Sequence, residues 1–191
     1  MKHRIVIFAS GGGSNFEALA KACAGGSIAA DIVLLVVSSM NAGAVEKAKK
    51  FNIPVCADAD FEAIKNAAPT LICLAGYMKL VPSSVLSIAP TMNIHPALLP
   101  SFGGKGMYGK HVHKAVIDSG AKQSGATVHF VDDKYDTGPI IIQQSVPVAD
   151  GDTPEILAKK VLEIEHVLYP RAVELFCKGE IFFENGRVRF K

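Results

Sequence analysis

The sequence predicts an α/β fold with one doubly wound, mainly parallel sheet and antiparallel strands in the C-terminal half. Short β-branched apolar runs alternate with segments of helical spacing through the first half, which is typical of βαβ units. Further on, two apolar runs are joined by only a short link, which suits an antiparallel pair. At 191 residues the chain has the length of about one domain, so we expect a single domain over 1–191.

In the first half, short apolar runs alternate with segments of helical spacing. Arg4–Ala9 stops at a glycine cluster, and Ser14–Ala24 then carries apolar residues at helical spacing. The further strands that we expect are Ile32–Val37, Ile53–Cys56, Leu71–Ala75 and Thr91–Ile94. The further helices are Ala42–Phe51, Phe61–Ala67 and one that starts near Val81–Ser84, with proline at an early position.

The second half begins with a loop over His95–Lys110 and a helix near His111–Asp118. The antiparallel strands are expected at Ala126–Val131 and Ile140–Val148. The longest helix is expected over Thr153–Cys177, with Asp152 or Thr153 as its cap and Pro170 as a source of a kink. Ile181–Phe183 and Val188–Phe190 are expected to form a hairpin around an Asn185-Gly186 turn.

Composition excludes several classes of protein. Hydrophobic residues make up 49% and charged residues 20%, so the chain is not disordered. Its apolar runs are too short to span a bilayer or to act as a secretory signal, so we expect no membrane association and a cytoplasmic location. The net charge of +2 is mixed along the chain, which argues against a nucleic-acid partner. The four cysteines lie far apart, and we expect buried thiols.

A glycine-rich segment lies between the first strand and the first helix, where α/β sheets bind phosphates. Ser10–Asn15 reads Ser-Gly-Gly-Gly-Ser-Asn, so backbone amides and two polar side chains can approach an anion at a helix N-terminus. A Walker A motif is excluded because no Lys-Ser/Thr follows the glycines, and Phe16 stands where a dinucleotide site needs glycine. The alternatives left open are a monophosphate site and a merely tight turn.

Asn93 and His95 stand at the carboxyl end of a predicted strand, where active sites of open parallel sheets collect. Strand alternation puts both side chains on one side, which gives an oxyanion donor beside a proton carrier. The alternative is a turn-forming asparagine and a structural histidine. Asp136 lies in a loop between the later strands, where it is either an ordinary turn residue or a carboxylate that orients His95 and raises its pKa. The pair His111 and His113 lacks a third ligand nearby, so we expect no metal.

Together, in this order, these segments resemble the phosphoribosylglycinamide formyltransferase family, with its Rossmann-like formyltransferase fold. The matching stretches are Ala9–Asn15, Leu74–Leu80, Asn93–Pro100, Gly125–Val131 and Tyr135–Ile141, and the similarity covers nearly the whole chain. The resemblance implies a single formyltransferase domain over 1–191. It also implies transfer of the formyl group of 10-formyltetrahydrofolate, a co-substrate, to the amine of glycinamide ribonucleotide in purine biosynthesis, without a metal.

The resemblance also implies a role for each site residue. Asn93 would stabilise the tetrahedral oxyanion, His95 would donate the proton, and Asp136 would raise the pKa of His95. The nucleotide would be held by Gly12, Gly13, Ser14, Asn15 and Glu165. The folate would be held by Met78, Lys79, Leu80, Val81 and Asn93, with the 132–136 loop reaching the pterin. The glycine-rich segment over 103–109 would affect affinity and loop motion and leave the chemistry unchanged.

Three other functions compete with this interpretation. A formyltetrahydrofolate deformylase carries an extra N-terminal domain and a methionyl-tRNA formyltransferase an extra C-terminal one, so length argues against both. A non-catalytic nucleotide-binding module would not need Asn93, His95 and Asp136 together. The partners expected are small-molecule substrates only, and the chain is expected to be a monomer or a homodimer.

Overall fold

The computed structural model describes residues 2–58, 60–184 and 187–191. Its elements, in chain order, are β1 (His3–Ala9), α1 (Ser14–Ala24), β2 (Ala30–Val37), α2 (Gly43–Lys50), β3 (Val55–Ala57), α3 (Phe61–Asn66), β4 (Leu71–Leu74), α4 (Ser83–Leu86), β5 (Thr91–His95), α5 (Lys110–Asp118), β6 (Gln123–Phe130), β7 (Ile140–Pro147), α6 (Pro154–Cys177), β8 (Ile181–Glu184) and β9 (Arg187–Phe190).

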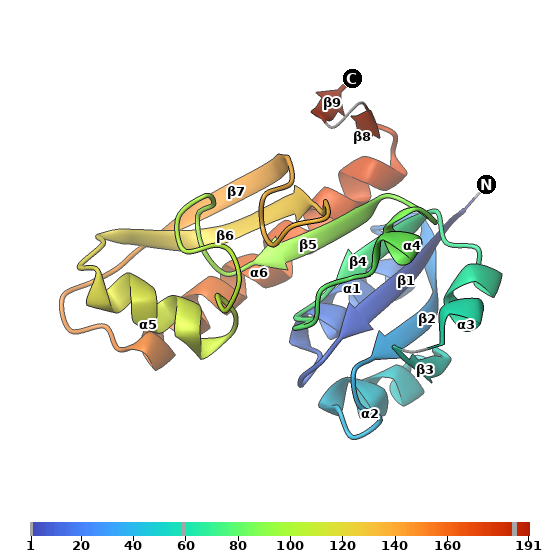
Figure 1. Cartoon of the computed structure of the whole chain (residues 1–191), viewed down its shortest axis with the longest axis horizontal. Helices are drawn as coiled ribbons and strands as arrows, with labels where there is room; N and C mark the ends of the chain where they lie inside the picture. The colour runs from blue at the N-terminus through green and yellow to red at the C-terminus, as the bar shows by residue number, and fades with distance from the viewer. Residues whose placement is uncertain (1, 59, 185–186) are drawn as a thin grey trace.

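Seven strands form one sheet in the order β3-β2-β1-β4-β5-β6-β7 (Figure 1). The strands from β3 to β5 pair in parallel, whereas β6 pairs antiparallel with both β5 and β7. This arrangement confirms the predicted fold class. Strand β3 starts two residues later than predicted, because the backbone N–H of Ile53 closes the end of α2 by donating to Ala48.

The central strands read as continuous apolar runs because both of their faces are buried. On β1, Ile5 and Ile7 belong to the core cluster that also holds residues of α1, α2, α5 and α6, while Val6 and Phe8 belong to the cluster that holds residues of α3 and α4. Such double covering is typical of parallel sheets. It leaves the carboxyl ends of the strands as the natural place for a site.

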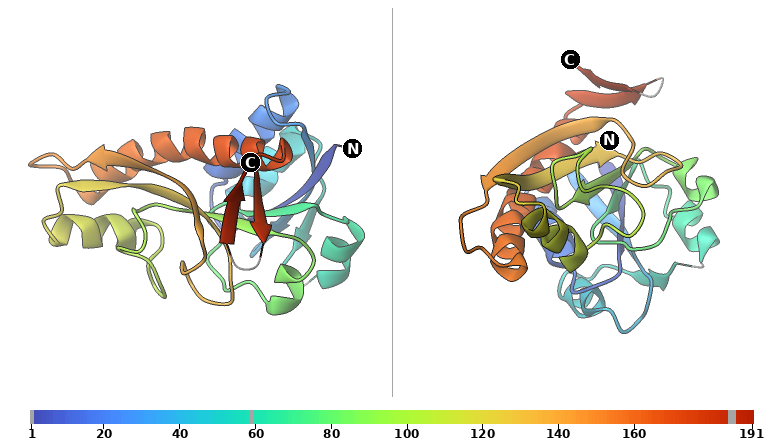
Figure 2. Two further views of the ribbon diagram at one scale, coloured as in Figure 1. Left: turned by 90° about the horizontal axis from the view of Figure 1, so that it is seen from above. Right: turned by 60° about the vertical axis from the view of Figure 1, so that its left-hand side comes forward.

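Helix α6 runs along most of the length of the molecule and packs on α1, α5, β6 and β7 (Figure 2). Of the two candidate caps, Thr153 is the one that accepts from the N–H of Ile156, at 3.3 Å, while Asp152 pairs with Lys160 instead. The hydroxyl of Tyr169 lies 3.1 Å from the carbonyl of Leu74 and 3.0 Å from that of Met92. One buried side chain therefore links α6 to both β4 and β5.

Tyr169→Phe is expected to lower the free energy of unfolding by about 1–3 kcal/mol, because two buried carbonyls lose their shared donor while the ring still fills its space. Urea denaturation followed by circular dichroism measures this change. The exposed Tyr135 supplies the matched control, and Tyr135→Phe is expected to leave stability within about 0.5 kcal/mol. Equal stability of the two variants would contradict the linking role.

Three smaller predictions have different outcomes. The C-terminal hairpin is confirmed as the pair β8–β9, whereas the Asn185-Gly186 turn lies outside the described residues. The prediction of buried thiols holds for Cys73 only, because Cys23, Cys56 and Cys177 lie near the ends of their elements and are partly exposed. Within the described part of the chain, no helix is long and apolar enough to cross a membrane.

Candidate active site

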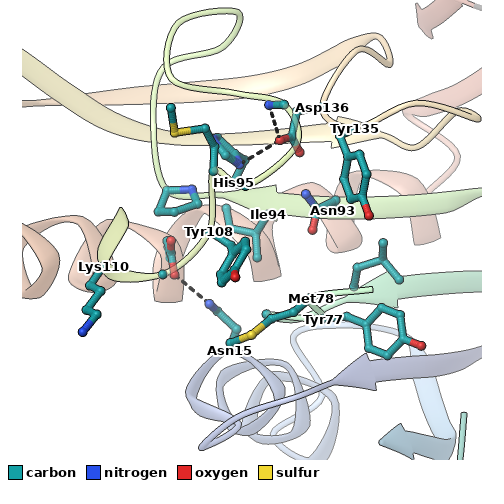
Figure 3. Close-up of a pocket in the computed structure, with 18 of the residues that line it drawn as sticks. Asn15, Tyr77, Met78, Asn93, Ile94, His95, Tyr108, Lys110, Tyr135 and Asp136 are labelled. Carbon is teal, nitrogen blue, oxygen red and sulfur yellow. Dashed lines mark hydrogen bonds and ion pairs between the residues drawn. The ribbon is translucent and has the colours of Figure 1, made fainter. Parts of the chain in front are cut away.

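A cavity of about 670 Å³ opens at the carboxyl ends of β4 and β5, between the 104–110 segment, α6 and the start of α1 (Figure 3). This volume falls in the range of small-molecule sites, roughly 300–1,000 Å³. Ten of the twelve site residues predicted from the sequence line it: Ser14, Asn15, Met78, Lys79, Leu80, Val81, Asn93, His95, Asp136 and Glu165.

Asn93 and His95 enter the cavity from the same side of β5, as strand alternation predicts. His95 is buried, and its Nε2 lies 2.8 Å from the carbonyl oxygen of Phe102. A carbonyl can only accept, so Nε2 carries a proton and donates it. The other nitrogen, Nδ1, lies 3.5 Å from Oδ2 of Asp136. Nδ1 is therefore the nitrogen that is free to gain and lose a proton.

Burial lowers the pKa of His95, whereas the Asp136 carboxylate and the Phe102 carbonyl raise it. Burial outweighs the other two, and the pKa of His95 lies below its ordinary value of 6.5. The predicted direction of the Asp136 effect is thus correct, but the expectation of a net raised pKa is wrong. The burial of His95 and its contact with Phe102 were not readable from the sequence. A pKa below 6.5 favours the neutral form of His95 at pH 7.

Asp136 lies between two imidazoles. It accepts from the N–H of Gly104 at 2.9 Å, and its two oxygens face His95 and, at 3.7 Å, Nε2 of His129. Burial alone would raise the pKa of this carboxyl, but the neighbouring His95 ring and the Gly104 hydrogen bond contribute to a pKa below its ordinary value. The loop also needs Gly138, where a Cβ would overlap the carbonyl oxygen of Phe130. Asp136 is therefore held close to β6 in its charged form.

The second glycine-rich segment, over 103–109, and the residue before it contact the site through their backbone. Phe102 accepts the hydrogen bond of His95, and Gly104 donates to Asp136. Phe102 and Gly104 both have positive φ angles, 57° and 101°, which turn these two backbone groups toward the site. The backbone at the start of the 103–109 segment and just before it therefore contacts both ionisable residues. The expectation that the segment leaves the chemistry unchanged stays a prediction.

One residue of the site was missed by sequence reasoning. His129 on β6 is buried, lines the cavity and lies opposite Asn93 in the β5–β6 register. Its Nε2 is 3.1 Å from Nδ2 of Asn93. The signal that could have found it is a histidine inside an otherwise apolar strand, but its partner depends on a register that the sequence does not specify.

At the other end of the cavity, Asn15 at the start of α1 donates to Oε2 of Glu165 on α6, at 2.7 Å. Burial raises the pKa of Glu165 to about 7, and the bond from Asn15 opposes this rise. Gly12 and Gly13 come shortly before Asn15 in the chain and pack against the start of α2. Gly13 has a φ of 69°, and a Cβ there would lie 2.7 Å from that of Ala44. The 10–15 segment therefore forms a tight turn that requires glycine at position 13. This turn is compatible with a bound phosphate and with a purely structural role.

The 78–81 segment forms a further wall of the cavity. Met78 and Leu80 are exposed and present apolar surface, whereas Val81 is buried and anchors the segment in the core. The N–H of Met78 donates to Oγ of Ser10 at 3.1 Å, which links this wall to the glycine-rich turn. Lys79 forms an exposed ion pair of 2.7 Å with Asp58.

No group of three potential metal ligands occurs among the residues that the structure describes. His113 is buried on α5 and lines the cavity, whereas His111 is exposed on the same helix. The two side chains therefore point apart.

Known proteins share both the sequence and the fold. A family model described as formyl transferase matches residues 3–173. A chloroplastic phosphoribosylglycinamide formyltransferase from Arabidopsis thaliana is 44% identical over 98% of this chain and 70% of its own length. Glycinamide ribonucleotide transformylase 1 from Symbiobacterium toebii has a TM-score of 0.90 and 34% identity, over 98% of this chain and 93% of that chain. The chain belongs to the phosphoribosylglycinamide formyltransferase family.

Members of this family differ in length. The chain spans 65% of the phosphoribosylglycinamide formyltransferase of Vigna unguiculata and 20% of the bovine trifunctional purine biosynthetic protein adenosine-3. A formyltetrahydrofolate deformylase from Pseudomonas syringae has a TM-score of 0.88 at 22% identity, which shows a shared fold alone. Membership of the phosphoribosylglycinamide formyltransferase family makes the chain an enzyme, and the predicted resemblance is confirmed.

Proposed function

We propose that the enzyme transfers the formyl group of 10-formyltetrahydrofolate to the amine of glycinamide ribonucleotide, as a step of purine biosynthesis. The observation that carries this proposal is the convergence of Asn93, His95 and Asp136 at one end of a single cavity whose other end holds Asn15 and Glu165. An amide donor, a proton carrier and a carboxylate suit acyl transfer without a covalent nucleophile.

Neutral His95 is the first proton acceptor in this mechanism. When the amine attacks the formyl carbon, it becomes cationic while the formyl oxygen becomes anionic. Nδ1 of His95 takes the proton, directly or through a water, and Asp136 at 3.5 Å stabilises the resulting imidazolium. The imidazolium then donates the proton to the leaving nitrogen of the folate. The pKa below 6.5 thus agrees with a proton donor that is loaded during each turnover.

The two substrates are assigned to opposite walls. We assign the nucleotide to Gly12–Asn15 and Glu165, because a helix N-terminus with approachable amides attracts a phosphate. We assign the folate to the 78–81 wall, Asn93 and the 132–136 loop, because the exposed Met78 and Leu80 offer apolar surface to a flat ring. Asn93 lines the same cavity and is assigned as the donor to the developing oxyanion.

Formation of formylglycinamide ribonucleotide from the two proposed substrates, followed by mass spectrometry, tests the activity. A parallel reaction without the nucleotide tests for hydrolysis of the formyl-folate. Product that forms only when both substrates are present supports the proposal. Formate release at the same rate without the nucleotide would contradict it and indicate a deformylase.

Asp136→Asn is expected to lower the pKa of His95 further, because the substitution removes the carboxylate that stabilises its charged form. Since neutral His95 accepts the first proton, activity falls as the pH drops through this pKa, and the acidic limb of the pH–rate profile should move to lower pH. The plateau should also fall by at least tenfold, because the imidazolium loses its counter-ion. NMR titration of the His95 ring, together with kcat measured against pH, checks both effects. An unchanged His95 pKa would contradict the role of Asp136.

Three predictions from the sequence remain predictions. The single domain over 1–191 and the monomeric or homodimeric state await measurement. The cytoplasmic location does too, since the plant relatives named above are chloroplastic.

A further inference from the structure

His129 and Asn93 form a cross-strand pair at the end of the cavity where the formyl group is proposed to react. His129 is 1% exposed and pairs with Asn93 in the β5–β6 register. Nδ2 of Asn93 lies 3.1 Å from Nε2 of His129, and Nδ1 of His129 lies 2.8 Å from the carbonyl oxygen of Phe130. Both ring nitrogens therefore have a polar partner.

These contacts determine which groups donate and which accept. The Phe130 carbonyl can only accept, so Nδ1 of His129 carries the proton. In the tautomer that these contacts select, Nε2 is the acceptor. Only the NH₂ end of the Asn93 amide can satisfy that acceptor, because the oxygen end would face it with a second acceptor. An asparagine side chain can present either its oxygen or its NH₂ group in a given direction. The contact with His129 thus selects the orientation of the Asn93 amide.

The nearby carboxylate does not compete for this bond. Asp136 lies 3.7 Å from Nε2 of His129, which is beyond hydrogen-bonding distance, and it accepts instead from the N–H of Gly104 at 2.9 Å. Asn93 is therefore the hydrogen-bond partner of Nε2.

The amide nitrogen has two hydrogens, of which His129 takes one. The second hydrogen remains available to a group bound in the cavity, which both residues line. A reversed amide would bring its oxygen there, and this oxygen would repel the developing oxyanion. We propose that His129 is a positioning residue that holds the amide nitrogen of Asn93 toward the formyl oxygen. The proposal rests on the oxyanion role assigned to Asn93 above.

Two substitutions separate the functions of the two ring nitrogens. In His129→Asn the shorter amide can still donate to Phe130, as Nδ1 does, but no acceptor remains for Asn93. In His129→Gln an amide oxygen can take the place of Nε2 and accept from Asn93, while the bond to Phe130 is lost. If His129 only stabilised the fold, both variants would lose activity to a similar extent.

His129→Asn is expected to lower kcat roughly 10- to 100-fold, a part of the 10²–10³-fold cost of losing an oxyanion donor, with KM for each substrate within about threefold. His129→Gln should have a kcat at least tenfold above that of His129→Asn. In an Asn93→Ala background, the further loss from His129→Asn should be less than about threefold, because the residue acts through Asn93. Equal losses in both single variants, or fully multiplicative losses in the double variant, would overturn the proposal.

NMR of the Asn93 side-chain amide distinguishes failure of this proposal from failure of the proposed function. In the wild type, the amide proton bonded to His129 should exchange slowly with solvent, and His129→Asn should abolish that protection. If Asn93→Ala keeps the wild-type kcat, the oxyanion role fails. If amide exchange is the same in the wild type and in His129→Asn, His129 does not position Asn93, whatever the kinetics.

Discussion

His95→Gln is expected to lower kcat by roughly 10²–10⁴-fold, the usual cost of losing a general acid–base group. The glutamine amide can still donate to Phe102, so the 102–104 segment keeps its anchor, but no group can then carry a proton between the amine and the folate nitrogen. KM for the two substrates should change by only a few fold, since the ring takes part mainly in the chemical step. Steady-state kinetics with each substrate varied in turn measures this split.

A histidine outside the cavity provides the control. His3 starts β1 and bonds Thr70 at 3.0 Å, so His3→Gln should leave kcat within about twofold. Retention of more than a tenth of the wild-type kcat by His95→Gln would show that water or another group carries the proton. The proposed mechanism would then be wrong at its central step.

Asn93→Ala is expected to lower kcat by roughly 10²–10³-fold, because the formyl oxygen loses its amide donor when it becomes negative. Asn93→Asp should be at least as severe, since a carboxylate there would face the developing oxyanion with a like charge. Because the interaction forms fully only in the transition state, KM should change far less than kcat.

Asn66→Ala, an exposed asparagine at the end of α3, is the matched control and should keep wild-type activity. Comparable activity of Asn93→Ala and Asn93→Asp at more than a tenth of the wild-type rate would contradict the oxyanion assignment.

Most of the fold was readable from the sequence because the central parallel strands β1, β4 and β5 are largely buried and therefore consist of apolar runs. Arg4–Ala9 was recognisable as a strand because Ile5 to Ala9 are all apolar, and they are apolar because all five are buried. The predicted boundary of β3 was wrong because Ile53 bonds back to α2, a local competition that apolar character cannot reveal. For the N-cap of α6 the sequence offered two adjacent candidates, Asp152 and Thr153. The hydrogen bond from the N–H of Ile156 identifies Thr153 as the cap, while Asp152 pairs with Lys160.

The candidate site was readable to the extent that it follows from strand ends. Asn93 and His95 are two residues apart on β5, so their common direction follows from alternation alone. The net pKa of His95 depends on burial beneath a segment that the sequence predicts only as loop. His129 was missed because its effect comes from a partner 36 residues away, brought opposite by sheet register.

The position of β5, parallel to β4 on one side and antiparallel to β6 on the other, has a consequence for folding. A nascent or refolding chain that has built only its N-terminal βαβ units has a glycine-rich turn and Asn93, yet it lacks His129 and Asp136 opposite them. Pairing of β5 with β6 joins residues on either side of the 96–122 segment, which includes α5. Return of activity after dilution from denaturant therefore requires this pairing, whereas helical signal can return before it.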